Sequence, residues 1–271
     1  MTERLAPLFE VLGRYSGLVT AYSGGADSAL LAWAAHEVHG LRALAVTAVS
    51  ASLPAAERAD ARAFARTYGL PQVEVCTDEL DRPGYRANRG DRCWHCKSAL
   101  MDAVLPIADA IGVPVALGTN LDDLTDHRPG QAAALGRGAV TPLVEAGMTK
   151  ADVRAASRAA ALVTAAKPAA ACLASRVAYH DPVDARALER VELAERALHE
   201  LGFGVVRVRA HGNGAVARVE VPVDRLGAAL EMRVAIVAAC RSAGFGFAAL
   251  DLDGFASGSM NRLLETRRAA R

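Results

Sequence analysis

Residues 18–31 constrain the fold more than any other part of the chain. An apolar strand runs into the turn SGGADS and then into an alanine- and leucine-rich helix. Gly24 and Gly25 can adopt backbone angles that other residues avoid, and they leave room for a ligand to touch the main chain. The helix that starts near Ala26 adds a positive dipole end and free N–H groups. The segment therefore predicts a strand–turn–helix unit that cradles a pyrophosphate.

Side chains around this turn add polar groups suited to that ligand. Ser23 and Ser28 supply hydroxyl donors, and Asp27 could hold Mg²⁺ or orient the loop. A Walker-type loop and a dinucleotide fingerprint each need a glycine spacing that this turn lacks. The turn instead resembles the PP-loop of ATP pyrophosphatases, which split ATP between its α and β phosphates. An ordinary Gly-Gly turn is the alternative, because short motifs often match by chance.

Length and composition are those of a soluble enzyme, which we expect to be cytoplasmic. The 271 residues allow one large or two modest domains, and 52% of them are hydrophobic. A net charge of +1 and a pI near 7.7 provide no basic field for nucleic acid. The first residues show neither a signal-peptide pattern nor an apolar run long enough to cross a membrane. We therefore expect no nucleic-acid or membrane partner.

The first half of the chain alternates strand and helix patterns. Such alternation predicts an α/β fold, in which a parallel sheet is covered by helices on both faces. Ligands of open α/β sheets bind at the carboxyl ends of the strands, where the glycine turn falls. The predicted strands are residues 18–22, 41–49, 72–76 and 113–118, and the predicted helices are residues 26–39, 54–68, 94–111 and 122–135.

The second half changes pattern after a short helix at residues 148–161 and a loop at 167–176. An α-β-β-α-β run there predicts a smaller α+β domain with a hairpin connection at residues 211–214. We therefore place a PP-loop domain at residues 1–175 and a small α+β domain at 176–271. The elements of the second domain are helices 184–201 and 226–243 and strands 205–209, 215–221 and 247–252.

Five cysteines in a chain without an export signal favour metal or catalytic use of some of them. Cys76 and Cys240 fall in apolar runs and are predicted to be core residues. Cys93 and Cys96 form a C-x-x-C at a helix start, where the dipole favours thiolates, and Cys172 supplies a third thiol. Spacing alone leaves open an iron–sulfur cluster with one labile iron, a three-cysteine zinc site, and a redox pair with a separate nucleophile.

Several longer motifs occur in a fixed order along nearly the whole chain. Together they resemble the LarE-type sulfur transferases of the PP-loop superfamily. The chain departs from that pattern at residues 162–166, which lack a Trp-Asp pair, and at Tyr179-His180. The motifs are Cys93-x-x-Cys96-Lys97, GTNLDD at 118–123, DHRPG at 126–130, TPL at 141–143, MTK at 148–150 and KPAAACLASR at 167–176.

The resemblance implies that this chain helps to make the organic part of a nickel-pincer nucleotide cofactor. ATP, with Mg²⁺, would adenylylate a carboxylate of pyridinium-3,5-biscarboxylic acid mononucleotide, and sulfur would then displace AMP to give a thiocarboxylate. One version of the family sacrifices the sulfur of a single cysteine. The other uses three cysteines to hold a 4Fe-4S cluster that carries hydrosulfide, and Cys93, Cys96 and Cys172 match that version.

The resemblance also implies that the domain at 176–271 serves sulfur transfer or oligomerisation, and it implies roles for individual residues. Asp224 is a weaker candidate for the sulfur-transfer site, and Asp122, Asp123 and Asp126 could bind metal but more often would cap a helix. Glu195 has an alternative role, since it could pair with Arg196 or His199 on a solvated helix face. The implied assignments are Ser23, Gly24, Gly25, Asp27 and Ser28 for pyrophosphate, Trp94 for stacking on the substrate, Ser175 and Arg176 for the substrate phosphate, and Glu195, Arg207 and Arg209 with Cys172 for sulfur transfer.

The expected partners are a small-molecule nucleotide, a sulfide source and further copies of the chain, with a hexamer as the size the family suggests. A tRNA-thiolating PP-loop enzyme is the leading competing hypothesis, although the near-neutral charge does not favour RNA contact. The sequence also allows sulfur transfer from a sacrificed Cys172, or a non-catalytic metal-binding module that retains a nucleotide pocket.

Overall fold

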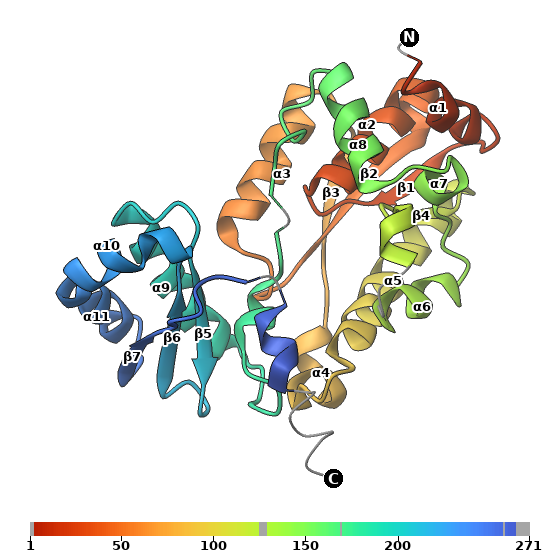
Figure 1. Ribbon diagram of the computed structural model, residues 1–271. Helices are drawn as coiled ribbons and strands as arrows, with labels where there is room; N and C mark the ends of the chain where they lie inside the picture. The colour runs from red at the N-terminus through yellow and green to blue at the C-terminus, as the bar shows by residue number, and fades with distance from the viewer. Residues whose placement is uncertain (1–2, 125–128, 169, 257, 264–271) are drawn as a thin grey trace. The chain divides into compact units, whose positions relative to one another are not determined.

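The computed structural model describes residues 3–124, 129–168, 170–256 and 258–263 (Figure 1). The chain divides into two compact units. The first unit comprises Met1–Glu79 and Cys93–Ala170, and the second comprises Leu80–Arg92 and Ala171–Arg271.

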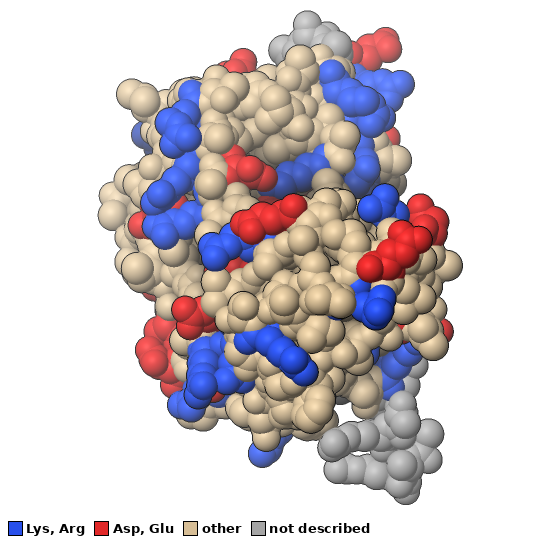
Figure 2. Space-filling model, turned by 90° about the vertical axis from the view of Figure 1, so that its left-hand side faces the viewer, with Lys and Arg blue, Asp and Glu red and all other residues tan. Residues whose placement is uncertain are grey.

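The surface carries both signs of charge. On the face drawn in Figure 2, lysine and arginine side chains are interspersed with acidic and uncharged ones. This mixture agrees with the balance of 31 basic and 30 acidic residues. Within the described ranges, no helix combines the length and the apolar character needed to cross a membrane.

The first unit is a parallel sheet with helices, as predicted. Its four strands run in the order β3-β2-β1-β4, and every neighbouring pair is parallel. The elements are α1 (Ala6–Leu12), β1 (Leu18–Ala21), α2 (Ala26–His39), η1 (Gly40–Arg42), β2 (Ala43–Val49), α3 (Ala55–Thr67), β3 (Gln72–Cys76), α5 (Arg92–Ile111), β4 (Val115–Leu117), η3 (Leu121–Leu124), α6 (Pro129–Leu135), α7 (Pro142–Glu145) and α8 (Lys150–Ala159).

Apolar side chains cover both faces of this sheet because neighbouring residues of a strand point to opposite sides. Leu18 of β1 packs into a cluster with α1, α2, α3 and α8, whereas Val19 packs into another cluster with α5 and α6. The strand is therefore buried on both sides, which explains why its sequence is a continuous apolar run.

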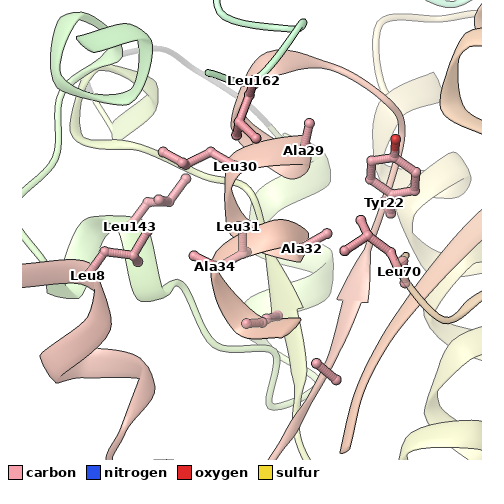
Figure 3. Packing of buried hydrophobic residues seen from close by; sticks show 14 of the residues in the cluster. Leu8, Tyr22, Ala29, Leu30, Leu31, Ala32, Ala34, Leu70, Leu143 and Leu162 are labelled. Atoms are coloured by element: carbon pink, nitrogen blue, oxygen red, sulfur yellow. The ribbon is translucent and has the colours of Figure 1, made fainter. Parts of the chain in front are cut away.

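Helix α2 is the best-buried helix of the first cluster (Figure 3). Leu30 and Leu31 are completely buried and pack with Leu8 and Leu143, while Ala29 and its small neighbours allow close approach. Burying a leucine side chain contributes about 1.5–3 kcal/mol. This packing fixes the amino-terminal end of α2, and with it the glycine turn.

The second unit contains a mixed three-stranded sheet of order β5-β6-β7. Strands β5 and β6 are antiparallel, as the predicted hairpin requires, whereas β6 and β7 are parallel. Helices α9 and α11 contact this sheet and each other. The elements are η2 (Glu79–Asp81), which begins at the last residue of the first unit, α4 (Pro83–Ala87), η4 (Leu173–Arg176), α9 (Ala185–Glu200), β5 (Arg207–His211), β6 (Val216–Glu220), η5 (Val223–Arg225), α10 (Leu226–Glu231), α11 (Arg233–Ser242), β7 (Phe247–Leu250) and η6 (Ser259–Asn261).

Residues 80–92 group with the second unit through Asn88, which is completely buried. Its side-chain amide donates hydrogen bonds to the carbonyl oxygens of Ala178 (2.8 Å) and Asp181 (3.1 Å). The backbone N–H of Val183 bonds to the carbonyl of Arg86 at 2.9 Å. These bonds satisfy buried polar groups and hold the two segments together.

Three expectations from the sequence are wrong in detail. In the helix predicted at 122–135, residues 122–124 belong to the 3₁₀ turn η3 and residues 129–135 form α6, while residues 125–128 lie outside the described residues. The helix predicted at 226–243 is broken at Met232, where no glycine or proline marks the break. Cys76 is exposed rather than buried, because β3 is the edge strand of the sheet and Cys76 is its last residue.

Candidate functional site

The glycine turn lies at the carboxyl end of β1, as the sequence predicts. Gly24 has φ +75°, a left-handed conformation that favours glycine, and a Cβ there would lie 2.9 Å from the Cβ of Ala61. Tyr22, immediately before the turn, donates a hydrogen bond from its hydroxyl to the carbonyl of Ala61 at 3.1 Å. Gly25 is the N-cap residue of α2. Helix α3 therefore supports the turn from one side.

The two serines of the turn contact each other. The hydroxyls of Ser23 and Ser28 are 3.1 Å apart, and the backbone N–H of Ser23 donates to the Ser28 hydroxyl at 3.2 Å. Ser28 also donates to the carbonyl of Gly25 at 3.2 Å. Ser28 is buried and braces the turn, whereas Ser23 is exposed. Of the two, Ser23 is therefore the one whose hydroxyl can reach a ligand.

Asp27 is held by two partners from distant parts of the chain. The ammonium of Lys150 forms an ion pair with its carboxylate, and the side-chain amide of Asn120 donates to it at 3.1 Å. The carboxylate is thereby oriented beside the amino-terminal end of α2. The sequence contained Lys150 and Asn120 in recognisable motifs, but it gave no signal that they meet Asp27.

The loop after β4 packs directly on the turn. A Cβ on Gly118 would lie 2.8 Å from the backbone nitrogen of Ser28, so only glycine allows this contact. Asp122 accepts a hydrogen bond from the backbone N–H of Lys150 at 2.9 Å, and Asp123 accepts one from that of Asn120 at 3.1 Å. Both aspartates therefore cap backbone groups, while Asp126 lies outside the described residues.

Cys93, Trp94 and Cys96 lie in the first turns of α5. Cys93 is exposed, Cys96 is half-buried, and Trp94 is 46% exposed. The start of α6 packs against this turn, since a Cβ on Gly130 would lie 2.8 Å from the carbonyl oxygen of Cys93. Helix α6 in turn reaches the loop after β4, where the side chain of Gln131 bonds to that of Thr119 at 3.4 Å. The cysteine turn and the glycine turn are therefore linked through one chain of contacts.

Cys172 begins a second group of predicted residues, all in the second unit. It is exposed and is the N-cap residue of η4, and the hydroxyl of Ser175 donates to its carbonyl at 2.7 Å. Arg176 is buried and donates to the same carbonyl at 2.8 Å and to both carboxylate oxygens of Glu195 at 3.0 and 3.2 Å. The arginine thus holds the cysteine loop against α9.

Glu195 is a buried structural acid, so its interpretation as half of an exposed surface pair is wrong. Only 7% of the residue is exposed, and its carboxylate also accepts the backbone N–H of Val208 at 3.0 Å. The acid therefore joins the cysteine loop to β5. Asp224, the weaker candidate, lies exposed in η5.

The strand residues form a charged cluster on one face of the mixed sheet. Arg209 is buried, donates to Glu220 at 2.8 Å and reaches the carbonyl of Ser175 at 3.4 Å. Arg218 binds the other oxygen of Glu220 at 2.8 Å and also pairs with Asp251. Glu220 itself is completely buried. Two of the three arginines on this face are therefore neutralised by carboxylates.

Arg207 is the exception in that cluster. Its guanidinium lies 5.5 Å from the ring centre of Phe255 and donates to the carbonyl of Val206 at 2.8 Å. Within the described part of the chain, it makes no ion pair with a carboxylate. Burial lowers the pKa of Arg207, and repulsion from Arg176 lowers it further. An anionic ligand would relieve this repulsion, so Arg207 is well placed to bind a phosphate.

The three cysteines expected to hold a cluster have thiols whose chemistry suits an iron–sulfur cluster, but they do not all belong to the same unit. Cys93 and Cys96 belong to the first unit and Cys172 to the second. Among the described residues, no group of three or more histidines, cysteines or acidic residues is close enough together to hold a metal ion. Cys240 is buried as predicted, and burial raises the pKa of its thiol to about 11.

The fold and the glycine turn define a parallel α/β protein with a strand–turn–helix unit at the carboxyl end of β1, a geometry suited to binding anions. The chain is 31% identical over 266 residues to the pyridinium-3,5-bisthiocarboxylic acid mononucleotide synthase of Lactiplantibacillus plantarum, covering 97% of this chain and 96% of that protein. It is 39% identical over 267 residues to an uncharacterized protein of Synechocystis, covering 97% and 99%. No family model matches the chain.

A third relative, an uncharacterized protein of Methanocaldococcus jannaschii, is 24% identical over 241 residues and is covered over 91% of its length. The chain belongs to the family of the LarE-type pyridinium-3,5-bisthiocarboxylic acid mononucleotide synthases.

Proposed function

We propose that this chain is an ATP-dependent sulfur transferase that converts a carboxylate of pyridinium-3,5-biscarboxylic acid mononucleotide into a thiocarboxylate. The observation that carries the proposal is the glycine turn at the carboxyl end of β1, with Gly24 at φ +75°, in a chain of this family. The N–H groups at the start of α2 suit the phosphates of ATP. The name of the Lactiplantibacillus relative supports the substrate.

In the first step, a substrate carboxylate oxygen attacks the α-phosphorus of ATP. The bond from that phosphorus to the bridging oxygen breaks, and pyrophosphate leaves with the negative charge. The turn residues Ser23, Gly24 and Gly25 would bind this leaving group, and Lys150 together with Mg²⁺ near Asp27 would neutralise it. The product is an acyl adenylate, in which AMP is a far better leaving group than oxide.

In the second step, sulfur attacks the activated carbonyl carbon, and the bond to the AMP oxygen breaks. Arg207 would bind the phosphate of the substrate nucleotide, and Trp94 would stack on its pyridinium ring. Arg176, Glu195 and Arg209 would set the geometry of the Cys172 loop through their hydrogen bonds to the loop and to β5. Their role in the reaction is thus to position Cys172 and Arg207.

For the sulfur source, we propose the version in which Cys93, Cys96 and Cys172 hold a 4Fe-4S cluster. Such a cluster would supply an open iron on which hydrosulfide can be renewed. Iron and acid-labile sulfide are measured on protein purified without oxygen, with each cysteine replaced by alanine in turn. About four irons per chain, lost in all three variants, would support this version. Dehydroalanine at position 172 after turnover would support a sacrificed cysteine instead.

The function is tested by pyrophosphate release. Purified protein, ATP and Mg²⁺ are mixed with the pyridinium dicarboxylate nucleotide, and parallel samples receive unmodified tRNA or no acceptor. We expect release that depends on the pyridinium nucleotide, and with sulfide a product in which oxygen is replaced by sulfur. Release triggered by tRNA would indicate a tRNA-thiolating enzyme, and no release with either acceptor would contradict the proposal.

A further inference from the structure

Residues 161–167, which precede the Cys172 loop, are fastened to α3 and its end at several points. The hydroxyl of Tyr68 donates to the carbonyl of Ala161 at 3.0 Å and accepts the backbone N–H of Val163 at 3.0 Å. Leu162, between them, is only 3% exposed and packs in the same apolar cluster as Leu30 and Leu143. The segment is therefore held by packing as well as by hydrogen bonds.

Lys167 makes the last of these attachments along the chain. Its ammonium lies 2.7 Å from a carboxylate oxygen of Glu57 and 3.0 Å from one of Asp60, and its side chain is only 14% exposed. Burial acts to lower the pKa of Lys167, but the hydrogen bonds to Glu57 and Asp60 outweigh it and hold the pKa above its ordinary value. The lysine is therefore charged at neutral pH.

The partners of Lys167 lie next to the support of the glycine turn. Glu57, Asp60 and Ala61 fall within about one helical turn of α3. Ala61 is the residue that approaches Gly24 and accepts the hydrogen bond of Tyr22. Lys167 thus ties its own segment to the same stretch of α3 that supports the glycine turn.

Lys167 lies five residues before Cys172 in the sequence. Five extended residues span at most about 18 Å, so the attachment limits how far the Cys172 backbone can move from α3. A buried ion pair is weak evidence for stability but can fix one geometry among several. We propose that Lys167, paired with Glu57 and Asp60, is a positioning residue: it fixes residues 161–167 on α3 and thereby limits the range of positions that Cys172 can take during sulfur transfer.

This inference rests on the proposed function. An acyl adenylate that sulfur does not attack is lost to hydrolysis, so a poorly positioned Cys172 lowers the yield of thiolated product. Coupling is measured as thiolated product formed per pyrophosphate released. In Lys167→Met, we expect the KM for ATP and the rate of pyrophosphate release to stay within about twofold, whereas coupling falls roughly tenfold. Lys167→Arg, which keeps the charge, should restore most of the coupling.

Arg62→Gln is the matched control. It removes another ion pair from the same helix, the one that Arg62 makes with Glu74 on an exposed face. We expect its coupling to equal that of the parent. In the triple variant Lys167→Met/Glu57→Gln/Asp60→Asn, coupling should be no lower than in Lys167→Met alone, because all three substitutions break one interaction.

Hydrogen exchange supplies a measurement that does not depend on the reaction. Peptides covering residues 161–172 should exchange faster in Lys167→Met than in the parent and Arg62→Gln. Unchanged exchange and unchanged coupling in Lys167→Met would overturn the inference, as would an equal loss of pyrophosphate release and coupling. If the parent releases no pyrophosphate, the proposed function fails, but the exchange experiment still decides whether Lys167 anchors the segment.

Discussion

At the scale of single residues, the proposed chemistry depends on two cationic side chains. Lys150 lies beside the glycine turn, and Arg207 would bind the phosphate of the substrate. Asp27 and Lys150 are 123 positions apart in sequence, yet they form an ion pair beside the start of α2. The sequence identifies Asp27 because it lies in a local motif. It cannot identify Lys150, because only the packing of α8 against α2 brings the lysine there.

Replacing Lys150 by methionine tests its role. We expect the rate of pyrophosphate release to fall about a hundredfold, because one charge that stabilises the leaving group is lost. The thermal midpoint should change little, since the pair with Asp27 is partly exposed. Lys150→Arg should recover part of the rate. Normal pyrophosphate release in Lys150→Met would contradict the assignment.

Arg207 gives a second prediction at this scale. Because it is the arginine of its cluster without a carboxylate partner among the described residues, Arg207→Gln should raise the KM for the pyridinium nucleotide at least about tenfold. The KM for ATP should not change. Arg225→Gln serves as the control, since Arg225 is exposed in η5 and contacts the ring of Phe203. Equal effects of the two substitutions on the KM for the pyridinium nucleotide would contradict a specific phosphate site.

At the scale of elements, the strands and helices with strong local patterns could be predicted closely. The predicted bounds of α2 and β3 match the structure, since Gly25 and Gly40 flank the apolar α2 and Pro71 directly precedes β3. The break at Met232 could not be predicted, because no breaking residue occurs there. The contact of Gly118 with Ser28 was also beyond prediction, since it joins segments far apart in the chain.

Gly118→Ala tests that contact. The added methyl group would lie 2.8 Å from the backbone nitrogen of Ser28, so the glycine turn must shift. We expect a destabilisation of about 1–3 kcal/mol and a clear rise in the KM for ATP. Gly13→Ala is the control, because its added Cβ would meet only ordinary contacts at 3.4 Å and beyond. Equal KM values for ATP in the two variants would show that the turn does not depend on Gly118.

At the scale of the whole molecule, each unit gathers residues whose proximity the sequence could only suggest through family resemblance. The cluster around Glu195 is an example. Spacing allowed an exposed helix pair, whereas the structure buries the acid against Arg176 and β5. Burial depends on the tertiary arrangement of α9 and the sheet, which helical spacing alone does not determine.

Stability should depend on pH through His211. Burial lowers the pKa of His211 below its ordinary 6.5, and the nearby Arg218 lowers it further. Between those two pKa values the unfolded chain binds a proton that the folded protein does not, so stability falls as pH drops through this window. One such proton changes the free energy of unfolding by at most about 1.4 kcal/mol per pH unit. His211→Gln should flatten the denaturation profile below about pH 6.5, and an unchanged slope would contradict this assignment.

The central claim is that a substrate carboxylate is activated by transfer of AMP before sulfur enters. The most direct measurement uses substrate whose carboxylate oxygens carry ¹⁸O, with ATP, Mg²⁺ and sulfide, followed by mass analysis of the released nucleotides. We expect one ¹⁸O atom in AMP and none in pyrophosphate, because the carboxylate oxygen that attacked the α-phosphorus leaves with AMP. Thiolated product together with unlabelled AMP, or label in ADP or phosphate, would contradict the claim.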